Sequence, residues 1–469
     1  MENKRLEAVL AQYNPWWTGE RSWQQSLPDY KRPVVDSVLA DLKEIGQVIS
    51  ITGPRRVGKS TALMHIISSL IDHHKIDPKR ILYFSFDDPD IFASQEFQSV
   101  IFDLLIERTK KFEGTCYFFL DEIQRLPRWE LYVKKYYDLK TSVRFIISGS
   151  ASSPIFRSSQ ESLLGRIKDH HLLPFSFREF CQYRLLSRPS FSQIIGSSKN
   201  LRQHLLNRDG PSALQCLANL HKELEPFEND IDQALMDYCL EGGFPEVWVL
   251  PDSVRKIEYL MEQQVRKVLY EDLMTVTQYR KPENVLRFFV YLLAHPGMEI
   301  NTVKISQESG VERRVVEENL PRLEMTDLII RIQKFRHQPL RVRQGNIKCY
   351  PVDMALRNAV LKTWTLPDSA AMGLYAENLV IRELITWPEL IEISYFREKD
   401  HEVDFVLTYA GSRYLPIEVK HRKQAEQITG LKRFAKIHKP KLAVVITADK
   451  TSKFDDFLYL PLKYFLLAS

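Results

Sequence analysis

A glycine-rich segment near residue 55 has the residue types and the spacing of a phosphate-binding loop. Residues 53–60 match the pattern G-x-x-x-x-G-K-[ST] in full. In such a loop, backbone N–H groups surround the β-phosphate of a nucleotide, the lysine contacts the β- and γ-phosphates, and the final hydroxyl binds Mg²⁺. We therefore predict an ATP site formed by Gly53, Pro54, Arg55, Arg56, Val57, Gly58, Lys59, Ser60 and Thr61, with Ser60 as a metal ligand.

Two adjacent carboxylates could complete this site. Asp121 and Glu122 directly follow the apolar run 117–120, which is typical of a fully buried parallel strand. The carboxyl ends of parallel strands meet at the edge of the sheet where ligands bind. We predict that Asp121 holds Mg²⁺ through water and that Glu122 polarises the water that attacks the γ-phosphate.

Further residues are candidates for contacts with the γ-phosphate. The apolar run 143–147 ends in Ser148-Gly149-Ser150, and Ser148 or Ser150 could sense the γ-phosphate or position the water. Arg166 follows Leu163-Leu164-Gly165 and could stabilise negative charge in the transition state, either in cis or across a subunit boundary. An ordinary surface arginine is the alternative for Arg166.

A second group of chemically active residues lies near the C-terminus. Glu418 and Lys420 are two positions apart, so both project from one face of a strand, and Asp404 on a neighbouring strand can meet them. Glu377 on a preceding helix can complete the group. Carboxylates suit Mg²⁺ or Mn²⁺, and we predict Asp404 and Glu418 as metal ligands. With Lys420 orienting water, the group fits metal-assisted phosphodiester hydrolysis; a module that binds without cutting is the alternative.

Both groups need rigid elements to position them. The pattern predicts a strand over 47–51 before the loop and a helix over 61–67 after it. Near the C-terminus it predicts a helix over 375–384 and strands over 402–407, 415–420 and 442–447, with a helix between the last two.

The middle of the chain is predicted to be helical and then to form a winged helix. Apolar spacing indicates helices over 285–293, 303–308 and 312–324, followed by a strand that begins at Leu328. The third of these helices carries arginines but also several glutamates, which oppose contact with phosphate. Contact with DNA and a structural or protein-binding role both stay open.

The motifs together resemble two known families. Residues 53–60, 120–129, 147–150, 164–166, 174–180 and 242–246 resemble prokaryotic AAA-type ATPases close to the archaeal STAND-like group. This resemblance implies ATP binding and hydrolysis, and a small helical lid over the nucleotide. Asp404 and Glu418-Val419-Lys420 are similar to the core pattern of the PD-(D/E)xK nuclease superfamily, which implies an intact or a decayed nuclease fold.

Length and composition set the remaining expectations. A chain of 469 residues with 44% hydrophobic content predicts two to four globular domains, and the net charge of +5 permits local nucleic-acid contacts without requiring them. The five cysteines form no C-x-x-C pair, and no signal peptide or membrane-length apolar run is present, so we expect a cytoplasmic protein. We predict an α/β multidomain chain: an N-terminal extension (1–45), an AAA-type P-loop core with a parallel sheet (46–174), a helical lid (175–280), a winged helix (281–350) and a PD-(D/E)xK-like α/β domain (351–469).

Two functional hypotheses follow. In the first, an ATPase controls an appended Mg²⁺-dependent or Mn²⁺-dependent nuclease that acts on DNA or RNA, with DNA favoured, in DNA processing or defence. In the second, a STAND-like switch uses its ATP state to expose the winged helix and C-terminal domain for binding DNA or a partner protein, without cutting. Assembly into a homo-oligomer is required only if Arg166 acts across subunits.

Overall fold

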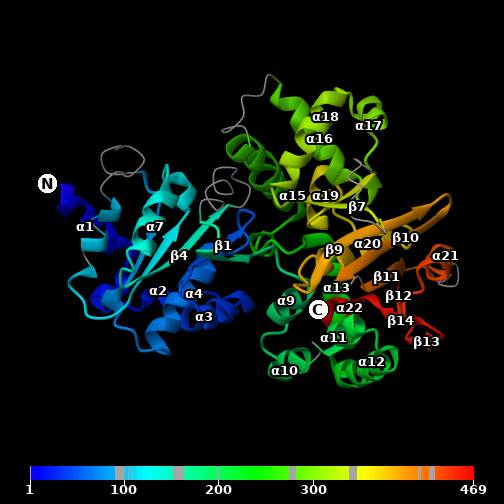
Figure 1. The fold of residues 1–469 in the computed structure, drawn as a ribbon, viewed down its shortest axis with the longest axis horizontal. Helices are drawn as coiled ribbons and strands as arrows, with labels where there is room; N and C mark the ends of the chain where they lie inside the picture. Colours follow the sequence, from blue (N-terminus) through cyan, green and yellow to red (C-terminus); the bar gives the residue numbers. More distant parts are fainter. Residues whose placement is uncertain are drawn as a thin grey trace. The chain divides into compact units, whose positions relative to one another are not determined.

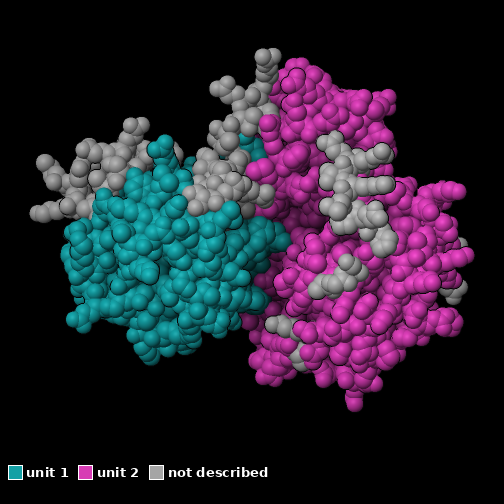
Figure 2. Space-filling view, viewed as in Figure 1, with its two compact units in different colours: residues 1–173, 271–278 teal, residues 174–270, 279–469 magenta. Residues whose placement is uncertain are grey.

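A computed structural model describes most of the chain, and its contacts divide the chain into two compact units. Unit 1 comprises Met1–Leu173 and Glu271–Gln278, and unit 2 comprises Pro174–Tyr270 and Tyr279–Ser469 (Figure 2). We describe each unit by itself. The described residues are 2–89, 101–103, 105–107, 109–150, 163–197, 200–273, 281–336, 346–409, 413–421 and 428–468.

Unit 1 is built around a parallel sheet of five strands in the order β2-β3-β4-β1-β5 (Figure 1). The strand β4, which ends in the two serines, lies between β1 of the phosphate loop and β3 of the carboxylates. The elements are α1 (Glu2–Tyr13), η1 (Pro15–Thr18), α2 (Ser22–Gln25), α3 (Pro33–Glu44), β1 (Val48–Gly53), α4 (Lys59–Asp72), η2 (Pro78–Arg80), β2 (Ile81–Ser85), β3 (Cys116–Asp121), η3 (Ile123–Arg125), α7 (Trp129–Asp138), β4 (Val143–Ser150) and β5 (Ile167–His171).

The central strands of unit 1 are apolar because helices cover both faces of the sheet. All six residues of β1 are buried, and alternate residues point to opposite faces. On one face, Phe118 and Phe145 pack with Trp129 and Val133 of α7. On the other face α4 contacts β1 and β4. The predicted strand before the loop and the helix after it are confirmed.

The N-terminal segment covers the edge of β2 that pairs with no other strand among the described residues. The fully buried Asn14 accepts a hydrogen bond from the backbone N–H of Tyr83 (2.6 Å) and donates to its carbonyl (2.8 Å). The indole N–H groups of Trp16 and Trp17 both donate to the carbonyl of Ile81. An edge strand exposes backbone groups that can pair with other chains, and these side chains satisfy them here.

Unit 2 begins with a helical segment and ends in a large sheet. Its helices are α9 (Phe177–Arg184), α10 (Pro189–Ser197), α11 (Asn200–Asn207), α12 (Gly210–Leu224), η4 (Glu225–Phe227), α13 (Glu228–Glu241), α14 (Pro245–Trp248), α15 (Ser253–Leu260), η5 (Met261–Arg266), η6 (Val268–Leu273, whose last residues belong to unit 1), α16 (Pro282–Ala294), α17 (Thr302–Ser309), α18 (Arg313–Glu324), α19 (Met354–Val360), α20 (Met372–Leu384), α21 (Thr429–His438) and α22 (Leu462–Leu467).

The sheet of unit 2 has nine strands in the order β13-β14-β12-β11-β10-β9-β7-β8-β6. Its strands are β6 (Met298–Glu299), β7 (Ile329–Lys334), β8 (Ile347–Pro351), β9 (Leu390–Glu398), β10 (His401–Tyr409), β11 (Arg413–Lys420), β12 (Ala443–Thr447), β13 (Ser452–Phe454) and β14 (Phe457–Pro461). The pairing of β7 with β9, at Gln333–Ser394 and Lys334–Tyr395, makes residues on both sides of position 350 part of one sheet. The strands that we expected in two domains are therefore hydrogen-bonded to one another.

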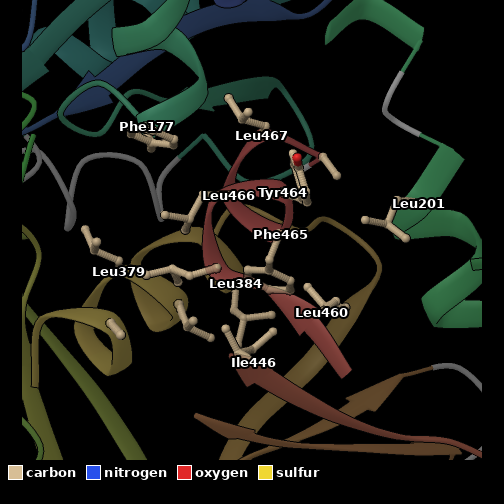
Figure 3. Close-up of a cluster of buried hydrophobic side chains, with 14 of the residues drawn as sticks. Phe177, Leu201, Leu379, Leu384, Ile446, Leu460, Tyr464, Phe465, Leu466 and Leu467 are labelled. Atoms are coloured by element: carbon tan, nitrogen blue, oxygen red, sulfur yellow. The ribbon is translucent and has the colours of Figure 1, made fainter. Parts of the chain in front are cut away.

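The helical segment and the C-terminal region share one hydrophobic core. Figure 3 shows side chains from α9 and α11 around the C-terminal helix α22, with α20 and the strands β12 and β14 beneath them. The labelled residues are Phe177, Leu201, Leu379, Leu384, Ile446, Leu460, Tyr464, Phe465, Leu466 and Leu467. Helices expected to form a lid thus pack against C-terminal residues within unit 2; a role of these helices over the nucleotide stays a prediction.

A buried polar cluster explains the glycine pair at 242–243. Asp353 accepts hydrogen bonds from the backbone N–H groups of Gly243 (2.6 Å) and Ala355 (2.8 Å). Gly242 has φ +65°, and a Cβ there would lie 1.9 Å from Asp353 Oδ1, so a side chain is excluded on both counts. Next to this cluster, Arg382 of α20 donates to the carbonyl of Pro174.

Candidate nucleotide site and carboxylate cluster

The phosphate loop of unit 1 has the geometry of an anion site. Gly58 adopts a left-handed conformation (φ +94°) and leads directly into α4, so the helix N-terminus faces the loop. The ammonium of Lys59 is buried and donates to the carbonyls of Gly53 (3.1 Å) and Pro54 (2.8 Å). A Cβ on Gly53 would lie 1.9 Å from the carbonyl oxygen of Leu172, so only glycine fits there.

The loop is held from outside by two arginines. Arg32 donates to the carbonyls of Val57 (2.9 Å) and Leu173 (3.1 Å), and Arg55 pairs with Glu271 at 2.9 Å. Arg56 has φ +61°, and Thr61 lies in the first turn of α4. These contacts fix the loop to its own unit.

Asp121 is the centre of a hydrogen-bond network at the end of β3. Its Oδ2 accepts from the hydroxyl of Ser60 (2.6 Å) and from the phenol of Tyr83 (2.8 Å). Its Oδ1 accepts from the hydroxyl of Ser148 and from the backbone N–H of Glu122 (3.1 Å). The two predicted Mg²⁺ ligands, Ser60 and Asp121, thus lie in direct contact. Tyr83 was not predicted as a site residue, because nothing in its local sequence indicates a partner 38 positions away.

Glu122 follows Asp121 in a strained backbone conformation. Its φ is +52°, which a non-glycine residue adopts at some energetic cost and which often marks a functional position. Its Oε2 accepts a hydrogen bond from the amide of Gln124 (2.5 Å). Burial raises the pKa of Glu122 above its usual range; Lys59 opposes this shift, whereas Asp121 adds to it. A carboxylate with a raised pKa suits proton transfer from water.

Ser150 and Arg166 lie at opposite ends of the sheet. Ser150 ends β4, is buried, and is the register partner of Gly53 in β1. Arg166 precedes β5, and its carbonyl accepts from Val48 at the start of β1. Five residues of strand, about 16 Å, separate that end of β1 from the loop. Arg166 instead pairs with Asp138 at 2.9 Å. Within unit 1, Arg166 therefore lies far from the phosphate loop, and its role, left open between cis and a subunit boundary, stays a prediction.

The C-terminal residues converge at one region of the nine-stranded sheet. The register Phe405–Ile417 of β10 and β11, extended by one step, brings Asp404 opposite Glu418. Asp404 Oδ2 accepts from the backbone N–H of Val419 (2.8 Å), and Lys420 Nζ lies 2.5 Å from Glu418 Oε1. Asp404 also interacts electrostatically with Glu377 of α20. Sequence reasoning thus placed these four residues in one neighbourhood.

Two residues of this cluster were not predicted. Lys348 of β8 lies 2.5 Å from Glu402 Oε1 and 3.6 Å from Glu377 Oε1, and its side chain is 6% exposed. Tyr350, also of β8, donates its hydroxyl to Glu377 Oε1 at 2.7 Å. The only signal in the sequence is the alternation of Lys348 and Tyr350 on one strand face. The packing of α20 against β8 brings that face to Glu377.

Burial and mutual repulsion raise the pKa values of the carboxylates. The pKa of Glu418 rises to about 8 because of burial and then Asp404, while Lys420 opposes the shift. The pKa of Glu377 rises to about 7 for the same two reasons, opposed by Lys348. Burial raises the pKa of Asp404 as well, against the effect of Lys348. A bound cation would stabilise the ionised forms of these three carboxylates.

The donor set fits a divalent cation only in part. Glu418 Oε2 is buried and has no hydrogen-bond partner, and a hard oxygen of this kind suits Mg²⁺ or Mn²⁺. No group of three or more His, Cys, Asp and Glu side chains with metal-binding geometry occurs among the residues that the structure describes. The fit therefore rests on Asp404 and Glu418 rather than on a complete ligand set.

The candidate nucleic-acid surfaces are unevenly charged. On α18, Arg314 pairs with Glu318 at 2.6 Å and Arg313 with Glu317 at 3.9 Å, so the arginines of this helix are largely neutralised. On α21, Lys432 and Lys436 are exposed one turn apart, and the exposed Lys439 directly follows the helix. Two further basic residues, Arg422 and Lys423, lie outside the described residues.

Comparison with known proteins identifies the first unit. Residues 46–181 match the family described as an AAA domain. The parallel sheet, the phosphate loop and this match together support a P-loop ATPase domain of the AAA type. Residues 232–365 and 372–465 match two families described only as domains of unknown function, DUF8612 and DUF4143.

Two proteins of Methanocaldococcus jannaschii resemble the chain along most of its length. "Uncharacterized protein MJ1637" is 25% identical over 460 residues, which covers 94% of this chain and 88% of that protein. "Uncharacterized protein MJ1544" is 25% identical over 371 residues, which covers 76% of this chain and 71% of that protein.

Solved structures resemble the chain more weakly. The ORC1 protein of Aeropyrum pernix in complex with DNA matches with a TM-score of 0.30 and 14% identity, over 72% of this chain and 93% of that chain. PCH-2 of C. elegans matches with a TM-score of 0.24 and 13% identity, over 38% of this chain and 47% of that chain. In the part of the chain that the structure describes, no helix is both long enough and apolar enough to span a bilayer.

Proposed function

We propose that this protein is an ATPase whose second unit hydrolyses phosphodiester bonds in nucleic acid, with DNA as the preferred substrate. ATP hydrolysis in unit 1 would control the C-terminal site. The observation that supports the second activity is the contact of Glu418 with Lys420 beside Asp404, with one buried carboxylate oxygen of Glu418 left without a hydrogen-bond partner.

In the ATP site, each residue has a role that follows from its position. Lys59 binds the β- and γ-phosphates, and Ser60 with Asp121 holds Mg²⁺. Glu122 accepts a proton from the attacking water, because its carboxylate lies beside Asp121 and has a raised pKa. Ser150 lies level with Gly53 at the end of the neighbouring strand and orients that water.

In the C-terminal site, Asp404 and Glu418 would hold the metal ion, and Lys420 would orient the attacking water. When bound, the ion supplies positive charge to the scissile phosphate. Glu377 is fixed by Tyr350 and Lys348, so it acts on the cluster through its charge. The predicted winged helix at 281–350 and the exposed lysines of α21 are the surfaces proposed to meet the substrate backbone.

A cleavage assay tests the proposal directly. Plasmid DNA, single-stranded DNA and RNA are incubated with the protein in Mg²⁺ or Mn²⁺, with and without ATP. The variant Lys420→Ala should lose cleavage, and Lys222→Ala is the matched control, because it removes an exposed lysine of α12, a helix that is not among the proposed binding surfaces. If the wild type cuts no substrate faster than Lys420→Ala, the phosphodiesterase assignment fails.

One observation favours the second hypothesis, a STAND-like switch that binds without cutting. Lys348 and Lys420 already supply positive charge to the carboxylates, so the cluster can be stable without a metal. In this case the winged helix and C-terminal region bind DNA or a partner protein according to the ATP state of unit 1. Calorimetry separates the two hypotheses, because the switch requires no Mn²⁺ binding at Asp404 and Glu418.

A further inference from the structure

The carboxylate cluster of unit 2 is divided into two halves by its partners. In one half, Glu402 contacts Lys348 at 2.5 Å and Arg397 at 3.6 Å, and Glu377 Oε1 contacts Lys348 and the hydroxyl of Tyr350. All of these contacts come from side chains of the protein itself. The buried ammonium of Lys348 thus supplies the positive charge that Glu377 and Glu402 require.

In the other half, one oxygen is left over. Glu418 Oε1 contacts Lys420, and Asp404 Oδ2 accepts from Val419, but Glu418 Oε2 is buried and has no hydrogen-bond partner among the described residues. The side chain of Glu418 is only 5% exposed. Burying a carboxylate oxygen without a hydrogen bond costs free energy. This oxygen therefore indicates a binding position for a cation or for a hydrogen-bond donor.

The charge of the cluster matches one divalent ion. Four carboxylates (Glu377, Glu402, Asp404 and Glu418) face two ammonium groups (Lys348 and Lys420), which leaves two negative charges when all are ionised. Including the neighbouring pair Arg397–Glu299, 2.9 Å apart, does not change this balance. Two divalent ions would instead leave the buried cluster positively charged.

We propose that Lys348 acts as a fixed cation in the Glu377–Glu402 half of the cluster, so that the site accepts a single divalent cation, on Asp404 and Glu418. The inference rests on the proposed phosphodiesterase function and deepens it. It also assigns a positioning role to a residue of β8, a strand outside the C-terminal region that carries the predicted nuclease motif.

Metal-binding stoichiometry tests the inference without measuring activity. The full-length, nucleotide-free protein is titrated with Mn²⁺ by calorimetry, and free Mn²⁺ is followed by electron paramagnetic resonance. The double variant Asp404→Asn, Glu418→Gln is the reference for ions bound elsewhere. We expect the wild type to bind one Mn²⁺ more than this reference.

The possible stoichiometries separate the inference from the function on which it rests. Two additional ions in the wild type would overturn the single-ion inference and leave the phosphodiesterase proposal intact. No additional ion would overturn the metal site itself, and with it both the phosphodiesterase proposal and the inference.

Variants of Lys348 test its role as the fixed cation. Lys348→Met removes a positive charge from a buried site, so the first Mn²⁺ should bind at least about tenfold tighter, or a second ion should bind. Lys348→Arg keeps the charge and should retain the wild-type stoichiometry. Unchanged Mn²⁺ binding in folded Lys348→Met would overturn the inference. If circular dichroism reveals that Lys348→Met does not fold, the number of Mn²⁺ ions bound by the wild type and by Lys348→Arg still decides whether the site accepts a single ion.

Discussion

Replacing Asp353 by asparagine should remove part of the pH dependence of stability in unit 2. The carboxylate is fully buried and accepts backbone hydrogen bonds from Gly243 and Ala355. Burial raises the pKa of Asp353 from 3.8 to about 6, although both hydrogen bonds and Arg382 oppose the shift. Asparagine has a similar shape but carries no charge at any pH.

The sign and size of the effect follow from linkage. The pKa of Asp353 is higher in the folded protein than in the unfolded chain, so the folded state binds the proton more tightly. Protonation of Asp353 therefore stabilises the fold. This stabilisation is complete below the unfolded pKa and is lost as pH rises through the folded pKa. A shift from 3.8 to about 6 corresponds to about 3 kcal/mol in total. About 2 kcal/mol of this loss falls between about pH 4.5 and about pH 7.5.

The assay is urea unfolding of the wild type and Asp353→Asn at several pH values, followed by circular dichroism and tryptophan fluorescence. The free energy of unfolding of the wild type, minus that of the variant, should fall by about 2 kcal/mol across this pH range. A constant cost of about 1–3 kcal/mol is expected in addition, because one of the two N–H groups loses its acceptor.

The matched control is Asp368→Asn, which removes an exposed carboxylate that also accepts a backbone N–H bond, from Ala371. It separates the effect of burial from the loss of a hydrogen bond to the backbone. A difference between wild type and Asp353→Asn that stays constant with pH would refute the reasoning.

Three further predictions concern unit 1. Glu122→Gln should lower ATP turnover at least about 100-fold while nucleotide binding persists, because the phosphate loop is unchanged. Phosphate release measures the turnover, and a fluorescent nucleotide measures the binding. Normal turnover would contradict the role of Glu122. Tyr83→Phe removes one hydrogen bond to Asp121 and should weaken the apparent Mg²⁺ affinity of the ATPase about tenfold; an unchanged Mg²⁺ titration would contradict this. Arg166→Ala should leave ATP turnover of dilute protein within about twofold of the wild type, since Arg166 lies at the far end of the sheet; a large loss at every protein concentration would argue against that placement.

The ATP site was predictable because its signals are local. The loop pattern, the strand before it and the helix after it are contiguous in sequence, and the acidic pair directly follows an apolar strand. Strand ends meet at one sheet edge by the geometry of parallel sheets, which brought Ser60 and Asp121 together. The position of Arg166 was left open, because the sequence between β4 and β5 does not reveal at which end of the sheet β5 begins.

The residues that sequence reasoning missed depend on contacts between distant segments. Tyr83 donates its hydroxyl to Asp121, and the backbone N–H of Tyr83 donates to Asn14, which is 69 positions away in the sequence. Lys348 and Tyr350 of β8 reach Glu377 because α20 packs against β8, where Asn378 donates to the carbonyl of Pro351. Local patterns contain no information on such pairings, so the positively charged half of the carboxylate cluster could not be inferred from residues 351–469 alone.

The continuous sheet of unit 2 limits how the protein can be divided. A fragment that begins after residue 350 would lose β6, β7 and most of β8, together with Lys348 and Tyr350. It would also expose the edge of β9, which invites aggregation through unsatisfied backbone groups. A recombinant fragment of this kind would therefore give a false negative in any cleavage test, and exchange of the C-terminal region between related proteins should succeed only when the strands from residue 298 onward are exchanged with it.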